Sequence, residues 1–257
     1  MIRGAGYRAG TAGLHAVGPI GNLLLLAGFL TVGLAPTGIT LKAATLGLIF
    51  ALGAISNASS RTFLGSLRFV LAFAAILFVA HVLSVREGTI LFTVGLPITT
   101  EGLSAGAGMA LRFLVILTSS FLFVTVTDPD RLAGVILRTG VPYRYGYVPI
   151  LALRFVPFFR SELRTVREAQ RIRGIRTSVR SLSGIRRAVR YTFVPVLVAG
   201  LMRVDSIAMS MKGRAFGLHR TRTNASPASW TKGDWAAAVG CGGLLAVVWI
   251  AWRYAWP

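Results

Sequence analysis

Several segments of this chain are apolar over lengths that match the thickness of a lipid bilayer. A membrane-spanning helix needs roughly 20 mostly apolar residues to cross about 30 Å of hydrocarbon. Four segments meet or approach this length, namely residues 20–35, 67–85, 103–126 and 235–252. A fifth segment, residues 39–55, is shorter and contains Lys42, whose long side chain can reach the membrane interface. We therefore predict about five transmembrane helices.

The composition excludes an ordinary soluble protein. Hydrophobic residues make up 54% of the chain and charged residues only 14%, whereas a soluble domain carries about 25% charged residues. The formal net charge is nonetheless +20. A chain this apolar and this basic is typical of an integral membrane protein with a basic aqueous face. Its one cysteine, Cys241, excludes a disulfide framework and any cysteine-based zinc site.

Two further apolar segments have the features of poor spanning helices. Residues 89–99 are too few and include Pro97, so we interpret them as a re-entrant or interfacial piece. Residues 191–202 are also few and are flanked by Arg190 and Arg203, which favours a helix lying under the bilayer. The N-terminal apolar segment has no convincing small-residue cleavage pattern, so we expect a retained helix and not a signal peptide.

The basic residues predict how the chain is oriented in a cell membrane. Of the 28 Lys and Arg residues, 19 lie between Arg131 and Arg222. Basic residues beside membrane spans favour the cytoplasmic side, which places this segment and the N-terminus in the cytoplasm. We expect four transmembrane helices in residues 1–127, a cytoplasmic domain in 128–234 and a C-terminal transmembrane helix in 235–257. The predicted fold class is therefore an all-α, multi-pass integral membrane protein with a cytoplasmic domain of amphipathic helices.

Helix signals organise this basic segment. Asp128-Pro129-Asp130 combines an N-cap, a proline at the first helical position and an acid at the positive end of the helix dipole. A second helix is expected over residues 150–174, where Gly174 is a natural C-terminal cap. A third is expected from Ser183, as its N-cap, to about Arg214. The basic segment is thus a set of helices and not a tail of random charge.

One charged residue lies deep within a predicted span. Arg112 falls inside residues 103–126, where a charge is costly and normally faces protein or water. Two interpretations are open. Arg112 either has an internal partner, such as Glu101 or a backbone carbonyl, or forms a contact surface for another subunit.

Two segments of the basic region share one pattern, an arginine beside a small residue at the end of a predicted helix. They are Ala169-Gln170-Arg171-Ile172-Arg173-Gly174 and Met209-Ser210-Met211-Lys212-Gly213-Arg214-Ala215-Phe216-Gly217. The pair resembles the Ala-Arg-Gly signatures of the transmembrane T component (EcfT/CbiQ-type) of energy-coupling factor (ECF) importers. Thr127-Asp128-Pro129, Gly140-Val141-Pro142 and Arg203-Val204-Asp205 also look like segments of that family, so the resemblance covers nearly the whole chain. The chain departs from the family at Ile172, where Ala is usual, and in the exchanged small residues around Arg214.

The resemblance implies a scaffold and coupling subunit of an ECF-type ABC importer for vitamins or transition metals. The coupling residues would be Arg173, Gly174, Gly213, Arg214 and Ala215, supported by Ala169, Gln170, Arg171 and Asp205. They would dock on two cytoplasmic ABC-type ATPases, which bind the ATP, because this chain has no Walker A signature. A small membrane-embedded S component would select the substrate, which this chain does not reveal. We expect no cofactor, metal site or catalytic residue in the chain itself.

Other functions remain open on the residues alone. A conventional ABC permease would bind its own substrate, but its single coupling loop is not evident. A membrane-embedded enzyme acting on phosphorylated lipids would need a base, nucleophile or metal, whereas His15, His81 and His219 are isolated from one another. Nucleic acid is not an expected partner because no recognition module is present. Attraction to anionic lipids, about 1 kcal/mol per basic residue, explains part of the charge in every case.

Overall fold

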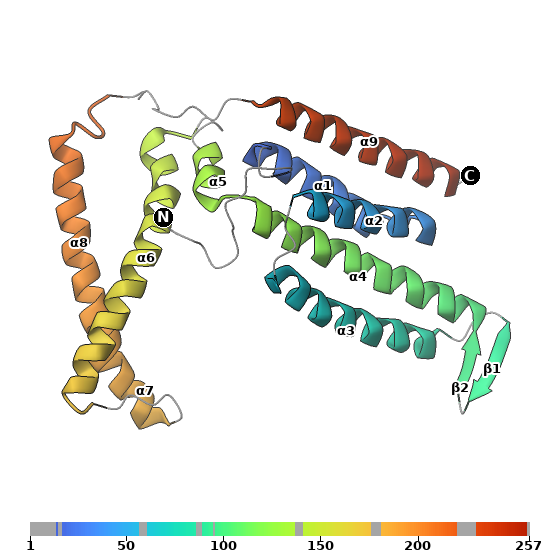
Figure 1. Cartoon of the computed structure of the whole chain (residues 1–257), viewed down its shortest axis with the longest axis horizontal. Coiled ribbons are helices and arrows are strands. Elements are labelled where there is room, and N and C mark those ends of the chain that lie inside the picture. The colour runs from blue at the N-terminus through green and yellow to red at the C-terminus, as the bar shows by residue number, and fades with distance from the viewer. Residues whose placement is uncertain are drawn as a thin grey trace. The chain divides into compact units, whose positions relative to one another are not determined.

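The computed structural model describes residues 14, 17–56, 61–85, 89–94, 96–136, 141–175, 181–219 and 230–255 (Figure 1). Its contacts divide the chain into two compact units. The first, here called the membrane unit, is formed by residues 3–132 and 228–257. The second, here called the arginine-rich unit, is formed by residues 133–227.

The membrane unit is built around one long central helix. This helix, α4 (Thr100–Val126), packs against α1 (Pro19–Leu34), α2 (Ile39–Ile55) and α3 (Arg61–Ser84). The last helix, α9 (Lys232–Ala255), packs on α1 (Figure 1). The buried core between these helices contains Phe29, Ile49, Val115, Leu122 and Val126. Helices form at all five apolar segments that the sequence predicts in this part of the chain.

The five helices differ in length relative to a bilayer. Those with enough length and apolar character to cross a membrane include Leu67–Ser84 in α3, Thr100–Val126 and Gly233–Arg253 in α9. In contrast, α1 has 16 residues and α2 has 17, which at 1.5 Å per residue give about 24 and 26 Å. The first two helices are therefore shorter than the hydrocarbon core they are predicted to cross.

Residues 90–94 and 96–99 form an antiparallel β-hairpin, and the placement of this segment as a re-entrant or interfacial piece stays a prediction. Strand β1 (Ile90–Val94) pairs antiparallel with β2 (Leu96–Thr99), and Val94 opposes Leu96 at the turn. The segment is too short for a spanning helix, and strand pairing satisfies its backbone groups instead. Thr99 then caps α4, because its hydroxyl accepts a hydrogen bond from the Gly102 N–H at 3.1 Å. Apart from this hairpin, the described chain is all-α.

A buried carboxylate fastens the last helix to the first. Asp234 is 2% exposed, and its Oδ1 accepts a hydrogen bond from the Gly21 N–H at 3.0 Å. Its Oδ2 accepts from the N–H and hydroxyl of Thr231 at 2.9 and 3.0 Å. A Cβ on Gly18 or Gly21 would lie 2.5 or 2.7 Å from a carboxylate oxygen of Asp234. Glycine at both positions therefore lets α9 approach α1 closely.

The arginine-rich unit is a pair of long antiparallel helices. The boundary between the units in the sequence falls within the short helix α5 (Pro129–Ile136), which begins at the predicted start signal. The first long helix is α6 (Tyr143–Ile172). The second consists of α7 (Leu182–Ala188), a π-helix η2 (Val189–Phe193) and α8 (Val194–Gly213).

Two predicted boundaries in this unit are wrong. The second helix begins at Tyr143 and not at residue 150, and it contains Pro149 and Pro157. Each proline removes one hydrogen-bond donor without ending the ladder, as is tolerated where neighbouring helices support the segment. The third helix has Ser181 as its N-cap instead of Ser183, since the Ser181 hydroxyl accepts from the Gly184 N–H at 3.1 Å.

The third predicted helix, from Ser183 to about Arg214, is confirmed apart from its first residues, and it contains the apolar segment 191–202 that the sequence indicated as a poor spanning helix. The helical stretch Gly184–Gly213 is continuous over 30 residues and is apolar enough to cross a membrane by length and composition. Pro195 does not interrupt it, because the proline lies in the first turn of α8 directly after the π-helix. The π turn shifts the pattern of backbone hydrogen bonds by one residue. Pro195 lies in the first turn after it, where the missing N–H of a proline is tolerated.

Candidate functional site

The first predicted coupling segment forms the carboxyl end of α6. The helix ends at Ile172, Arg173 is its C-cap, and Gly174 follows with a φ of +71°. The Gly174 N–H donates to the Arg171 carbonyl at 3.0 Å, and the Ile175 N–H donates to the Gln170 carbonyl at 2.9 Å. This pair of bonds is a Schellman motif, which needs a left-handed residue after the cap. Glycine supplies that conformation without strain.

The second predicted coupling segment ends α8 in the same way. Gly213 is the last helical residue, Arg214 is the C-cap, and Ala215 has a φ of +55°. The Ala215 N–H donates to the Lys212 carbonyl at 3.0 Å, and the Phe216 N–H donates to the Met211 carbonyl at 2.9 Å. Arg173 and Arg214 therefore occupy equivalent positions at two helix ends. The exchange of small residues in the sequence leaves the backbone motif unchanged, but it places alanine in the left-handed position.

Residues from the start of α6 hold the turn after Arg214. The rings of Tyr143 and Tyr147 pack on Phe216 at centroid distances of 5.3 and 5.4 Å. The Arg144 guanidinium donates a hydrogen bond to the Gly217 carbonyl. These contacts join the start of α6 to the end of α8, which makes the second arginine end part of the packed helix pair.

Both arginines are available to a partner. Arg173, Gly174, Gly213, Arg214 and Ala215 are all exposed. Among the described residues, neither Arg173 nor Arg214 has a side-chain hydrogen bond or ion pair; the one ion pair there joins Arg131 to Asp128 at 3.9 Å. A guanidinium presents five donors in a planar fork that matches a carboxylate, and a cation is favourable at a helix C-terminus. Such an end can dock on an acidic groove.

The side chain of Ile172 projects away from the rest of the chain. It is 88% exposed and directly precedes Arg173. The bulk that distinguishes this position from the family pattern is therefore almost fully exposed.

The predicted supporting residues have different roles in this geometry. The Ala169 carbonyl accepts the Arg173 N–H at 3.2 Å, so Ala169 belongs to the cap itself. Arg171 is exposed beside it, whereas Gln170 is buried. Asp205 is exposed in the middle of α8, nine residues before Arg214, and the structure does not bring it to either helix end.

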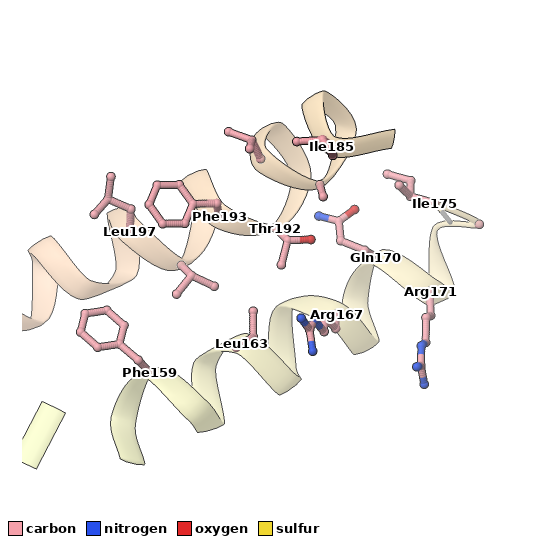
Figure 2. Close-up of a pocket in the computed structure, with 14 residues that line it drawn as sticks. Phe159, Leu163, Arg167, Gln170, Arg171, Ile175, Ile185, Thr192, Phe193 and Leu197 are labelled. Atoms are coloured by element: carbon pink, nitrogen blue, oxygen red, sulfur yellow. The ribbon is translucent and has the colours of Figure 1, made fainter. Parts of the chain in front are cut away.

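A cavity beside the first arginine end was not predicted from the sequence. It has a volume of about 1180 Å³ and lies between α6 and the α7–η2–α8 helix (Figure 2). Apolar side chains form most of its lining, including Phe159, Leu163 and Leu197. Figure 2 shows the Gln170 amide and the Thr192 side chain between the two helices, and the Gln170 Oε1 is buried without a hydrogen-bond partner in the described structure. The π-helix contributes Val189, Thr192 and Phe193 to the lining of this cavity. A π turn has no sequence pattern by which it could be predicted.

The arginine-rich unit also exposes a large apolar surface on α8. Exposed side chains there, here called the α8 apolar surface, are Val194, Leu197, Val198, Leu201, Met202 and Val204. Contiguous exposed apolar surface indicates a protein or membrane contact. This surface lies on the same helix that ends at Arg214.

Arg112 has no internal partner among the described residues. Its Nε is buried and makes no hydrogen bond. Glu101, the partner considered from the sequence, is exposed eleven residues earlier on the same helix, about 16 Å along its axis. Glu101 is therefore not the internal partner of Arg112 that the sequence allowed.

The part of the chain that the structure describes contains no group of three His, Cys, Asp or Glu side chains placed to hold a metal ion. His81 lies within α3, where its Nδ1 is 3.2 Å from the Leu77 carbonyl. This is a local contact within one helix.

Comparison with known proteins relates the sequence of this chain to those of transporter components. Residues 14–224 match the sequence model of a family described as cobalt transport protein, CbiQ. The chain is similar to the energy-coupling factor transporter transmembrane protein EcfT of Thermosediminibacter oceani, at 27% identity over 259 residues and 97% of each chain. It is also similar to the proteins of that name from Lacticaseibacillus paracasei, at 29% identity and 93% of each chain, and Listeria innocua, at 25% and 91%. These relatives are named as membrane components of transporters and not as enzymes.

Proposed function

This chain belongs to the cobalt transport protein family, CbiQ, and on that premise we propose that it is the transmembrane coupling component of an energy-coupling factor importer. It passes the motion of two cytoplasmic ABC-type ATPases to a membrane-embedded S component. That S component binds the cargo, a vitamin or a transition metal ion. The coupling component itself neither hydrolyses ATP nor selects the cargo.

The observation that carries this proposal is the equivalence of the two arginine helix ends. Arg173 and Arg214 are both exposed C-caps, each followed by a left-handed residue in a Schellman motif. Two partners of the same kind need two equivalent contact points, and a pair of similar ATPases meets that requirement. Each guanidinium then enters a groove on one ATPase and pairs with carboxylates there. Loss of one partner of a buried charge pair costs about 2–5 kcal/mol.

The packing of the arginine-rich unit supports transmission of motion. A Cβ on Gly200 of α8 would lie 2.6 Å from the Phe159 ring of α6, so the two helices approach closely. The Arg203 guanidinium lies over the Phe158 ring at 5.7 Å, a second contact between the same helices. Because close-packed helices move as bodies and do not deform continuously, displacement of an arginine end moves the helix that carries it.

The α8 apolar surface supports a contact with the S component. Its side chains are exposed on the helix that ends at Arg214, so an ATPase that moves Arg214 also moves this surface. An apolar membrane protein is a suitable partner for it, since burying the surface removes it from water. The S component would then follow the rotation or tilt of α8.

The basic residues support the orientation that this function requires. With 19 of the 28 Lys and Arg residues between Arg131 and Arg222, the positive-inside tendency favours a cytoplasmic arginine-rich unit and N-terminus in the cell membrane. Only this orientation exposes both arginine ends to cytoplasmic ATPases.

Co-purification tests the proposal directly. The chain is co-expressed with its ATPases and S component, and Arg173→Ala, Arg214→Ala and the double variant are isolated from membranes through a tag on this chain. We expect each single variant to lose part of the ATPase and the double variant to lose nearly all of it, with unchanged amounts of this chain in the membrane. Arg164→Ala, at an exposed arginine in the middle of α6, is the matched control and should retain the ATPases. Full recovery of both ATPases by the double variant would refute the docking role.

A further inference from the structure

Two basic residues of the membrane unit, Lys42 and Arg112, have no acidic partner among the described residues. Lys42, in the first turn of α2, is 5% exposed. Arg112 lies in the middle of α4, and its buried Nε has no partner. A Cβ on Gly53 of α2 would lie 3.7 Å from Leu122 of α4. Lys42 precedes Gly53 by about as many residues as Arg112 precedes Leu122, so the packing of α2 on α4 brings the two cations to the same level of the unit. Neither side chain has a hydrogen bond or ion pair with any residue that the structure describes.

The packing of α1 on α4 places these residues at one level of the bilayer. A Cβ on Gly33, near the end of α1, would lie 2.9 Å from Ile116 Cγ1. Arg112 is one helical turn from Ile116, and the next residues of the chain, 35–38, connect α1 to α2. Arg112 is therefore level with this connection. Helical side chains lean towards the amino terminus of their helix, so Lys42 leans towards the same connection.

The amino terminus of α2 adds a third positive element. Its N-cap is Gly38, which provides no side-chain cap, and its first turn contains no acidic residue. The free N–H groups and the helix dipole at such an end favour an anion. Lys42, buried and unpartnered, lies in this same turn.

The acidic side chains that the structure describes in this unit lie elsewhere. Glu101 is exposed at the start of α4. Asp128 pairs with Arg131 beyond the other end of that helix. Asp234 is bound to Gly21 and Thr231 near the start of α1. Unpaired charges are costly in a low-dielectric interior, and none of these acidic side chains balances Lys42 and Arg112.

We propose that Lys42, Arg112 and the amino terminus of α2 bind the phosphate group of an anionic phospholipid. The short helices favour a lipid over a soluble anion. With 16 and 17 residues, α1 and α2 are shorter than the hydrocarbon core, and a short helix draws the bilayer surface towards its end. Headgroups then reach the depth of Arg112. The exposed side chains of Leu34 and Ile39 flank the connection and offer apolar contact to an acyl chain.

Lipid binding by the purified chain in its transporter complex tests this proposal. The complex is placed in nanodiscs of phosphatidylcholine, with or without phosphatidylglycerol, and bound lipid is counted by native mass spectrometry. Thermal unfolding in the same nanodiscs is the second measurement. We expect retained phosphatidylglycerol and a higher unfolding temperature in its presence. Each of Lys42→Met and Arg112→Met should weaken retention about fivefold, which corresponds to one basic residue near an anionic surface.

Three controls distinguish lipid binding at this pair from a general effect of charge, from misfolding and from binding of a free anion. Arg68→Met changes an exposed arginine of α3 and should leave retention unchanged. Lys42→Arg and Arg112→Lys keep both charges and should keep the lipid, even if the methionine variants fold poorly. Inorganic phosphate in phosphatidylcholine nanodiscs should give no stabilisation.

Several results would overturn the proposal. Stabilisation by inorganic phosphate alone would identify a free-anion site. Unchanged phosphatidylglycerol retention by the double methionine variant would remove both residues from lipid binding. If the double methionine variant is more stable than the parent by the same amount with and without phosphatidylglycerol, the two charges only repel each other and bind no lipid. Loss of the S component with retention of the lipid would assign the pair to a protein contact.

Discussion

Exchanging glycine and alanine at the two arginine helix ends should change stability in opposite directions. Ala215 holds a φ of +55° after Arg214, whereas Gly174 holds +71° after Arg173. A left-handed conformation costs a residue with a Cβ about 1–2 kcal/mol, and glycine loses about 0.4–1 kcal/mol more chain entropy on folding than alanine. The net effect is about 0.5–1 kcal/mol. Ala215→Gly should therefore stabilise the protein, and Gly174→Ala should destabilise it by a similar amount.

A third exchange separates backbone conformation from packing. Gly213 precedes Arg214 within the helix. Apart from chain neighbours and the local helix backbone, no heavy atom lies within 4 Å of a Cβ added at Gly213 or Gly174. Because the space is open at both positions, alanine at 174 meets only backbone strain. Alanine at 213 instead gains helix propensity of about 1 kcal/mol. Gly213→Ala should therefore stabilise the protein while Gly174→Ala destabilises it.

Unfolding of the purified protein in one detergent, by denaturant or heat, measures these differences. A change of 1 kcal/mol shifts the unfolding temperature of a chain this size by about 2–4 °C. The expected order of stability is Ala215→Gly and Gly213→Ala above the parent, with Gly174→Ala below it. If Ala215→Gly destabilises the protein, or if Gly174→Ala has no effect, the two ends do not share the backbone motif and the equivalence of Arg173 and Arg214 is lost.

Two further substitutions test the packing that holds each unit together. Asp234→Ala leaves the Gly21 and Thr231 donors without their buried acceptor, so we expect a loss of about 2–4 kcal/mol in the unfolding free energy. The exposed Glu101→Ala should cost less than about 0.5 kcal/mol. If both variants lower the thermal stability equally, Asp234 does not hold α9 against α1. Gly200→Ala forces a Cβ to 2.6 Å from the Phe159 ring and should cost about 1–3 kcal/mol by overpacking. Adding Phe159→Leu to that variant should recover part of the loss in the same measurement, and no recovery would show that the two residues are not in contact.

Each arginine end belongs to a helix that also carries a second candidate contact surface. Arg214 ends the helix whose α8 apolar surface is exposed, and Arg173 ends the helix that lines the cavity with Gln170. A force applied at either cap therefore acts on a long rigid element. Under the proposed function, the membrane unit anchors the chain while the arginine-rich unit carries the coupling contacts.

Local patterns of the sequence determined most of the membrane unit. The apolar segment 39–55 coincides with α2, and the segment 103–126 lies within α4, which begins at Thr100. Spanning helices can be located in this way because the bilayer, and not a distant residue, decides where an apolar segment ends. Gly174 was also predictable as a cap, because glycine signals its own left-handed conformation.

Tertiary structure decided what depends on residues distant in the sequence. The left-handed Ala215 carries no local signal, and its turn is held by Tyr143, Tyr147 and Arg144 from the start of α6. The link from Asp234 to Gly21 joins opposite ends of the chain. Lys42 and Arg112 lie at the same level only because α2 packs on α4. Apolar periodicity predicts which residues are buried. It does not predict which buried residues contact each other, because those contacts depend on how the helices pack.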